Sequence, residues 1–452
     1  MMFTAADPAL TDFGRDPWWI VLIKLLFAFV VGMGLTVLGV WFERRVVAYM
    51  AQRPGPNQVG PFGLLQTLMD GIKGMLKEDI LPKKADKVVF FFAPTICAIF
   101  ALTSLSVIPF AGKVSMFGHV TPMQVTDLPV GALVVLACSS MAVYGIVLGG
   151  WASGSTYPLL GGLRSSAQMI SYEVALGLSL VAVFMTAGTM STSGIVAAQA
   201  HGSAYTVLGV TLHAPSWYAL LLIPSFLVFL VSAFGETNRA PFDLPEAESE
   251  LVAGYMTEYS SIKFMLYMLA EYVAMVSMSA MITTLFLGGW RAPWPITLWS
   301  GANDGWFGLL WFFAKVTLIL FLFVWVRATL PRLRYDQFMR FGWKVLLPVN
   351  LLWIVVLAGI KTMQTESMEA RTKWVVIIGV VVVLGVVALL WPNSRKEPDP
   401  AVQERRAARS AGGFPVPPMD LQVPPSPRAK RAVAERRPAN VPGASTPDSE
   451  EV

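Results

Sequence analysis

The sequence predicts an all-α polytopic membrane protein with about nine transmembrane helices and one amphipathic interfacial helix. Of its 452 residues, 55% are hydrophobic and only 14% are charged, a balance far from that of soluble domains. Apolar runs of about 18 residues or more, long enough to cross about 30 Å of hydrocarbon, recur along the chain. One further run with helical periodicity is too polar to span and is expected to lie at the membrane surface.

The apolar runs define the expected spans in chain order. They lie near residues 18–42, 88–110, 128–150, 172–190, 217–235, 268–289, 307–327, 343–360 and 373–391. The segment before them has no basic region followed by a cleavage site, so the first span is expected to act as its own insertion signal. The expected organisation is an outer N-terminus (1–17), an eight-helix core (18–360), an extra ninth helix (361–391) and a tail (392–452).

Lysine and arginine set the expected orientation. They are frequent in segments 43–87 and 327–344 and scarce in 191–216 and 290–306, so the rich segments are expected to face the cytoplasm. With the N-terminus outside, nine crossings place the basic tail on the cytoplasmic side as well. The tail, 392–452, is rich in Pro, Arg, Ala and Ser and is expected to be disordered, either solvated near anionic lipid or docking a partner.

Several function classes are disfavoured. The net charge of +5 is not accompanied by interleaved aromatic and basic residues, so no nucleic-acid binding is expected. Cys97 and Cys138 lie in apolar runs without a CxxC motif, which indicates small buried side chains and no iron–sulfur ligation by this chain. His119, His201 and His213 are expected in outer loops without the spacing of zinc ligands, so no metal site is predicted.

Residues 235–261, GETNRAPFDLPEAESELVAGYMTEYSS, concentrate charge in an otherwise apolar chain. Asp243, followed by a proline and by Glu246, has the form of a helix start with an Asp N-cap. The helix dipole accounts for the first-turn acids Glu246 and Glu248. It does not account for the remaining charged residues of the stretch, which are Glu236, Arg239, Glu250 and Glu258.

Two more acids lie at membrane depth, Glu173 in SYEVALGLSL and Glu271 in LYMLAEYVAMVSM. A carboxylate in hydrocarbon is costly unless it faces a polar cavity, pairs with a base or takes up a proton. Because burial and like charge raise the pKa of carboxyl groups, a chain of such acids can load and release protons near neutral pH. The sequence therefore predicts an intramembrane polar cavity, with interfacial side chains that reach headgroup water as the alternative.

A second cluster follows the first span, in RPGPNQVGPFGLLQTLMDGIKGMLKEDILP. Its glycines and prolines predict a tight, extended turn. The apolar residues recurring after it at helical spacing, opposite Asp70, Lys73 and Lys77, are Leu64, Leu65, Leu68, Ile72, Met75 and Leu76. This pattern indicates an interfacial helix. With Arg53 before it and a carboxylate on it, the helix could line an entrance for an amphiphile from the lipid phase.

The stretches RPGPNQVGPFGLLQTLMDGIK and GETNRAPFDLPEAESELVAGYMTEYSS closely resemble the two signature regions of one family, the quinone-tunnel membrane subunits of the proton-translocating NADH:quinone oxidoreductase, respiratory complex I. The match runs through most of residues 18–360 and includes SYEVALGL and AEYVAM. The resemblance implies an eight-helix core, sometimes with a ninth helix, that builds most of the quinone tunnel. It places Arg53, Phe62, Asp70, Arg239 and Asp243 along the tunnel. It assigns proton coupling to Glu173, Glu236, Glu246, Glu248, Glu250, Glu258 and Glu271.

The resemblance also implies cofactors and partners. Quinone, either ubiquinone or menaquinone, would be the substrate, while NADH, FMN and iron–sulfur clusters would be used by partner subunits. The chain itself would bind no cofactor or metal and hold no catalytic residue, acting as one subunit of a translocase. Its partners would be the other membrane-arm and peripheral-arm subunits in a bacterial plasma membrane.

Three alternative functions remain at this point. A homologous subunit with the same acidic loop occurs in membrane-bound hydrogenases and related complexes. An ion-coupled transporter acting alone would also use intramembrane glutamates, although no internal repeat is visible. A passive membrane anchor would leave the buried acids unexplained.

Overall fold

The computed structural model describes residues 8, 10–200, 204–207, 210–213, 217–243, 252–293, 296, 301–303, 305–365 and 379. Seven helices in this part of the chain are long and apolar enough to cross a membrane, and an eighth apolar helix is shorter. These helices confirm the all-α polytopic class. The predicted ninth span and the tail lie outside the described residues, apart from Gly379.

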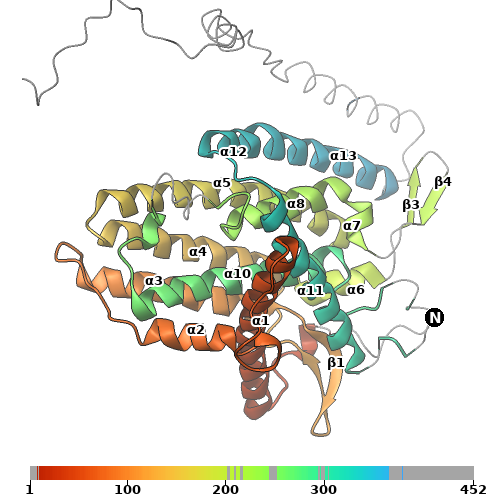
Figure 1. Cartoon of the computed structure of the whole chain (residues 1–452). Coiled ribbons are helices and arrows are strands. Elements are labelled where there is room, and N and C mark those ends of the chain that lie inside the picture. The colour runs from red at the N-terminus through yellow and green to blue at the C-terminus, as the bar shows by residue number, and fades with distance from the viewer. Residues whose placement is uncertain are drawn as a thin grey trace, which may run out of the picture. The chain divides into compact units, whose positions relative to one another are not determined.

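The long helices pack together in a bundle (Figure 1). Their bounds are α1 Trp18–Met50, α3 Lys87–Ser104, α4 Gly131–Ala152, α5 Thr156–Ala187, α10 Ser261–Phe286, α11 Phe307–Thr329, and the pair α12 Tyr335–Phe341 and α13 Leu347–Thr365, joined by a π-helical turn Gly342–Leu346. Helices α3 and α10 run parallel, with Ser104 bonded to Ser277, and so do α5 and α13, with Ala175 bonded to Asn350. The shorter helices are α2 Gln66–Met75, α6 Thr192–Ala200, α7 Tyr218–Leu221 and α8 Ile223–Glu236. Short 3₁₀ turns lie at Leu10–Asp12, Pro61–Gly63, Leu105–Val107 and Gly254–Met256.

Several of the expected spans are longer than predicted, most clearly those of α5 and α1. Helix α5 begins at Thr156 instead of near 172, because its first half carries polar side chains that lower the hydropathy of the run. Three of these, Ser165, Gln168 and Ser171, are nevertheless buried inside the bundle. Helix α1 has 33 residues. At about 1.5 Å per residue it is roughly 50 Å long, which exceeds the hydrocarbon thickness and takes its last two turns beyond the apolar run.

The fifth expected span, 217–235, is interrupted. Helix α7 ends at Leu221, Leu222 has a non-helical backbone, and α8 starts at Ile223 with a proline in its first turn. Proline lacks an N–H group and suits the first turn of a helix, so Pro224 marks the new start. The eighth expected span is also longer, because α12 and the π-helical turn precede α13.

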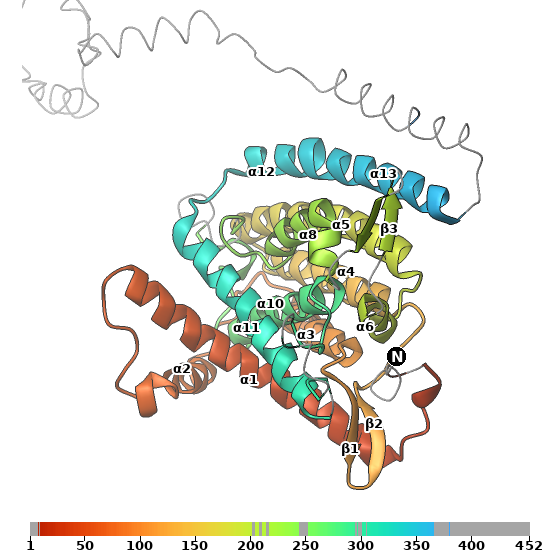
Figure 2. The same ribbon diagram turned by 90° about the vertical axis from the view of Figure 1, so that its right-hand side faces the viewer.

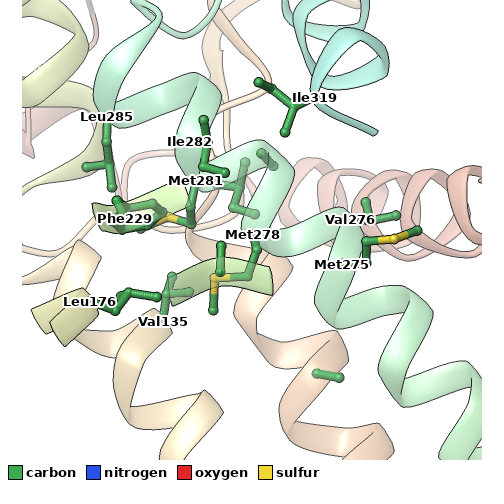
Figure 3. Packing of buried hydrophobic residues seen from close by; sticks show 14 of the residues in the cluster. Val135, Leu176, Phe229, Met275, Val276, Met278, Met281, Ile282, Leu285 and Ile319 are labelled. Carbon is green, nitrogen blue, oxygen red and sulfur yellow. The ribbon is translucent and has the colours of Figure 1, made fainter. Parts of the chain in front are cut away.

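Helix α10 lies at the centre of the bundle and is the most buried of the seven long helices. Figure 3 shows its apolar side chains directed at Val135 of α4, Leu176 of α5, Phe229 of α8 and Ile319 of α11. The labelled contributors from α10 are Met275, Val276, Met278, Met281, Ile282 and Leu285. Because lipid tails are as apolar as these residues, close packing is what stabilises such a core.

Two β-hairpins were not predicted. Strand β1 (Ala111–Met116) pairs antiparallel with β2 (His119–Met123), and β3 (Ala204–Val207) pairs with β4 (Val210–His213). The first hairpin turns through two residues with positive φ, Phe117 at 49° and Gly118 at 84°, as a tight hairpin turn requires. His119 and His213 therefore lie on strands and not in loops, because pairs of four to six residues give too short a pattern to recognise. His201 lies outside the described residues.

The bundle has two distinct ends. The hairpin end holds β1 and β2 beside the N-terminal part of α1, whereas the α2 end holds α2 beside the last turns of α1 (Figure 2). At the α2 end α8 stops at Glu236 and is followed by residues 237–243, here named the neck, all of which are buried. Helix α10 starts at the same end after the turn 252–260.

Candidate functional site

A small space of about 60 Å³, here named the inner cavity, lies among α3, α4, α5, α8, α10, the turn before α10 and the first residues of the neck. Its polar lining residues are Cys97, Ser104, Cys138, Ser139, Glu236, Thr237, Asn238, Tyr255, Tyr267, Glu271 and Ser277. The lining contains no basic residue among those described. Two of the predicted acids, Glu236 and Glu271, therefore share one cavity.

The acids around the inner cavity differ in their partners. Tyr255 donates a hydrogen bond to Glu271 over 3.0 Å, and Ser140 donates to Glu173 on α5. Glu236 is 4% exposed, and neither of its carboxylate oxygens has a hydrogen-bond partner among the described residues. Ionising a carboxyl group in such surroundings costs several kcal/mol. Whether Glu236 is charged therefore depends on the polar or charged partners that reach it in the inner cavity.

A larger and more open space of about 640 Å³ lies at the α2 end and is here named the arginine cavity. It is lined by Glu43, Arg44, Val47, Ala48, Arg53, Pro54, Gly55, Pro56, Arg327 and Ala328. Glu43 forms an ion pair with Arg327 of α11 and accepts a hydrogen bond from Tyr272 of α10 over 3.1 Å. Three arginines and one paired glutamate make this cavity a polar site with excess positive charge.

The turn after α1 lines part of the arginine cavity, and α2 is joined to one of its lining residues, Arg44. Arg44 forms an ion pair with Asp70, which also accepts a hydrogen bond from Gln66 over 2.9 Å. Phe62 has a positive φ of 56°, an uncommon conformation for a residue with a Cβ atom. Its carbonyl accepts hydrogen bonds from Arg45 over 2.8 Å and Trp41 over 3.1 Å, which stabilise that conformation.

The Arg44–Asp70 pair leads to a prediction about pH. Partial burial raises the pKa of Asp70, but hydrogen bonds from Arg44 and Gln66 and the charges of Arg44 and Lys73 outweigh burial and hold that pKa below its usual 3.8. A group with a lowered pKa stabilises the fold above its usual pKa, and this stabilisation is lost as pH falls through the lowered value. We expect the attachment of α2 to α1 to be constant from about pH 7 to 5 and to weaken only below about pH 4.

This expectation is measured with an environment-sensitive fluorophore on Lys77→Cys, just beyond α2, in the reconstituted protein. The acid transition should disappear in Asp70→Asn, which has no group to protonate at this position. A transition centred between about pH 5 and 7 that depends on Asp70 would contradict the lowered pKa.

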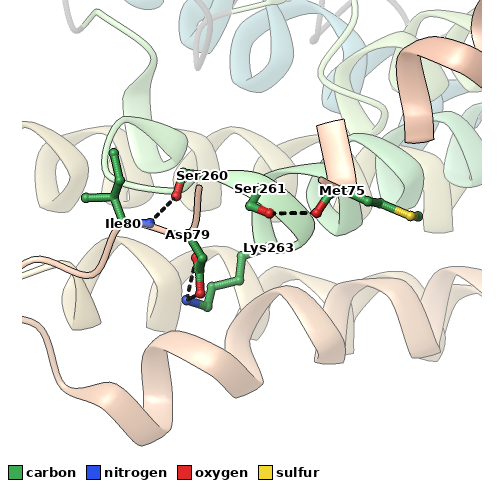
Figure 4. Close-up of polar contacts among 6 residues, drawn as sticks. All are labelled: Met75, Asp79, Ile80, Ser260, Ser261 and Lys263. Atoms are coloured by element: carbon green, nitrogen blue, oxygen red, sulfur yellow. Dashed lines mark hydrogen bonds and ion pairs between the residues drawn. The ribbon is translucent and has the colours of Figure 1, made fainter. Parts of the chain in front are cut away.

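The segment after α2 is held against the start of α10 (Figure 4). Lys263 contacts both carboxylate oxygens of Asp79, at 2.9 and 2.8 Å. Ser260 accepts a hydrogen bond from the backbone N–H of Ile80 over 2.8 Å, and Ser261 donates to the carbonyl of Met75 over 3.1 Å. Helix α2 is thereby fastened to the helix that carries Glu271 and Tyr272.

The neck runs from the inner cavity to the ring of Tyr272. Its first residues, Thr237 and Asn238, line the inner cavity, whereas the guanidinium carbon of Arg239 lies 4.0 Å from the centre of the Tyr272 ring. Asp243 at the end of the neck is 3.2 Å from Arg332. On α10, Glu271 lines the inner cavity and the next residue, Tyr272, bonds to Glu43 in the arginine cavity.

The approach of α8 to α5 beside the neck requires a glycine. A Cβ atom at Gly235 would lie 2.8 Å from the ring of Tyr172, closer than real Cβ contacts allow. Tyr172 stacks on Phe338 of α12 at 4.1 Å and donates a hydrogen bond to its carbonyl over 3.0 Å. The neck is therefore packed between α5 and the last helix pair.

The structure brings six of the twelve predicted site residues into two groups. Arg53 lines the arginine cavity. Near it, Asp70 pairs with Arg44, which also lines the cavity, and the carbonyl of Phe62 accepts a hydrogen bond from the neighbouring Arg45. The other group is the acids Glu173, Glu236 and Glu271, at or beside the inner cavity. Glu258 is half-buried in the turn before α10 and lines neither cavity. Glu246, Glu248 and Glu250 lie outside the described residues, as does the helix predicted to begin after Asp243.

Sequence reasoning missed three residues that join the groups: Glu43, Tyr272 and Arg327. Glu43 follows the first apolar run, and the rule that selected Glu236, an acid at the end of a span, would have selected it. Arg327 was counted only as a charge that sets orientation. Tyr272 has no signal in the sequence beyond its position after Glu271.

The two cysteines are free and buried, as the sequence indicated. They line the inner cavity, and Cys97 donates a hydrogen bond to the carbonyl of Ala142 over 3.3 Å. In the part of the chain that the structure describes, no group of three His, Cys, Asp or Glu residues is arranged to hold a metal ion.

Comparison with known proteins agrees with the resemblance seen in the sequence. The family described as NADH dehydrogenase matches residues 23–358, which include both cavities and the neck. The H subunit of the NADH-quinone oxidoreductase of Streptomyces avermitilis is 51% identical over 430 residues, covering 93% of this chain and 92% of that protein.

Proposed function

This chain belongs to the H-subunit family of NADH-quinone oxidoreductase, and from that premise we propose that it forms the quinone tunnel and couples quinone reduction to proton translocation. It is an integral membrane protein and a subunit of an oxidoreductase complex. The proposal assigns quinone binding to the arginine cavity and proton handling to the inner cavity. NADH, FMN and iron–sulfur clusters are assigned to partner subunits.

The arginine cavity suits a quinone headgroup in size and charge. Its volume of about 640 Å³ falls in the range of small-molecule sites. The exposed ring of Phe62 and the exposed apolar residues of α2 offer a path from lipid for an isoprenoid tail. The reaction takes two electrons from a partner subunit and two protons to form quinol, and arginine side chains stabilise the negative charge that develops on the quinone oxygens.

The coupling proposal rests on one observation: two consecutive residues of α10 contact two different cavities. Tyr272 bonds to Glu43 in the arginine cavity, while Glu271 faces the inner cavity. Negative charge on the quinone competes with Glu43 for Arg327, and a change in that ion pair reaches α10 through Tyr272. Arg239 stacks on the same ring, so a movement of Tyr272 also displaces the neck and, with it, the adjacent Glu236.

The orientation follows from charge. The segments rich in Lys and Arg, 43–87 and 327–344, contribute to the α2 end, so we place this end at the cytoplasm and the N-terminus outside. The peripheral-arm subunits would then cover the arginine cavity, and the other membrane-arm subunits would continue from the bundle. Glu246, Glu248, Glu250 and Glu258 are proposed to extend the acidic path at the cytoplasmic side.

The experiment replaces Glu236 with Gln in the native complex. We expect assembly to be retained, inhibitor-sensitive quinone reduction by NADH to fall about threefold, and protons pumped per NADH to fall at least by about half, because a carboxamide cannot exchange a proton. Proton uptake and NADH oxidation are measured together in inverted membrane vesicles. The matched control is Glu78→Gln, an exposed acid that lines neither cavity.

The outcomes separate the two parts of the proposal. Normal pumping by Glu236→Gln would refute the role of the inner cavity in proton coupling. Absence of any NADH-driven quinone reduction in the unmodified complex would refute the proposed activity itself.

A further inference from the structure

Gln168 on α5 contacts three separate points around the neck. Its amide nitrogen lies 3.0 Å from the carbonyl oxygen of Gly235, 3.2 Å from Oδ1 of Asn238 and 2.9 Å from the carbonyl oxygen of Phe242. The residue is fully buried, and its own oxygen has no hydrogen-bond partner among the described residues. A buried amide oxygen without a hydrogen-bond donor costs free energy. The hydrogen bonds that the amide nitrogen of Gln168 donates must therefore offset this cost.

Each of the three acceptors directly precedes a charged residue of this region: Glu236 at the inner cavity, Arg239 on the Tyr272 ring, and Asp243 beside Arg332. Gly235 precedes Glu236, Asn238 precedes Arg239, and Phe242 precedes Asp243. Asn238 has a positive φ of 49°, so the chain reverses sharply at the central contact. The side chain of Gln168 on α5 therefore contacts the backbone or side chain at three places along the segment 235–242. Within this segment, Glu236 lines the inner cavity and Arg239 stacks on Tyr272.

The face of α5 around Gln168 supports the same contact. Met169 lines the inner cavity and its sulfur lies 3.8 Å from the amide nitrogen of Asn238. Tyr172, one turn further, packs against Phe242 with ring centres 5.6 Å apart. Residues at spacings of three and four lie on one helix face, so α5 presents a single surface to the neck.

We propose that Gln168 is a positioning residue for proton coupling: its amide holds the neck so that Glu236 faces the inner cavity while Arg239 stacks on Tyr272. This inference rests on the proposed function of the two cavities. Without the amide the neck can shift along α5. The positions of Glu236 at the inner cavity and of Arg239 on Tyr272 are then no longer fixed relative to each other. Quinone reduction then proceeds but drives proton movement less efficiently.

The chain offers a matched control in Gln199 of α6. Its amide nitrogen donates to the carbonyls of Thr284 and Leu285, at 3.0 and 3.1 Å, and it is equally buried. It caps the far end of α10 and touches neither cavity. Removal of either amide nitrogen leaves buried acceptors without a donor, and Gln199→Met also removes the oxygen that accepts from the backbone N–H of Tyr218 over 3.4 Å. A purely structural role therefore predicts consequences for Gln199→Met at least as large as those for Gln168→Met.

The test compares Gln168→Met and Gln199→Met in the complete complex. We expect similar small losses of thermal stability in both, but protons pumped per NADH to fall about threefold only in Gln168→Met, with the KM for quinone changed by less than about twofold. Asn238→Ala removes one acceptor and should change the pumping ratio less when added to Gln168→Met than when made alone, because the two side chains act through one contact.

Equal pumping ratios in the two glutamine variants would overturn the proposal, as would full additivity with Asn238→Ala. The proposed function is tested separately by Glu236→Gln. If that variant loses pumping and Gln168→Met does not, the cavity assignment stands and the positioning role fails; if Glu236→Gln pumps normally, the cavity assignment fails first.

Discussion

Arg327→Met is expected to lower quinone reduction by the assembled complex by about tenfold or more. The arginine, itself 32% exposed, pairs with Glu43, whose side chain is only 10% exposed, so its removal leaves a largely buried carboxylate without its counter-charge. Breaking one side of a fully buried pair costs about 3–5 kcal/mol and a partly exposed pair costs less, while each 1.4 kcal/mol is about tenfold in rate or binding. Tyr272 remains as a neutral donor to Glu43 and offsets only part of this cost.

The measurement is inhibitor-sensitive NADH:quinone reductase activity normalised to assembled complex. Arg327→Lys should retain more activity than Arg327→Met, because it keeps the charge. Adding Glu43→Gln to Arg327→Met should recover complex stability, because no unpaired charge is then left buried. An Arg327→Met complex with wild-type activity would show that the pair is not part of the quinone site.

Tyr172→Ala is expected to have the largest effect on stability, about 3–5 kcal/mol, as for other deletions of a large aromatic side chain from a core. Tyr172 is fully buried, stacks on Phe338, and fills the space that the missing side chain of Gly235 leaves beside α8. Its removal leaves a void between α5, the neck and α12 that the surrounding helices cannot fill.

The matched variant Tyr172→Phe keeps the ring and loses only the hydrogen bond to the Phe338 carbonyl, which should cost about 1 kcal/mol. Thermal unfolding of the purified complex and protease cleavage in segment 330–334, just before α12, measure the two effects. Equal destabilisation by both variants would show that the hydroxyl, and not the ring packing, holds α12 in place.

The hydropathy of the chain was sufficient to predict the helical class and the approximate places of the seven long apolar helices in the described residues, because each long helix must carry a mostly apolar surface. It failed at the start of α5 and at the break before α8. Buried polar residues such as Gln168 lower hydropathy without ending a helix, whereas Pro224 starts a new helix inside an apolar run. The hairpins were missed because two short strands leave too little pattern.

For the site, the amino-acid pattern was enough to identify groups that are costly in a membrane: Glu173, Glu236 and Glu271 among apolar residues, and Arg53 and Asp70 near the expected interface. That cost comes from desolvation, which depends on the chemical type of the group and on the apolar residues next to it in the chain. The packing of the helices was needed to show that Glu236 and Glu271 share a cavity, that Glu43 pairs with Arg327, and that Gln168 contacts the neck. These contacts join residues far apart in the chain, and they depend on the crossing of helices that local patterns do not specify.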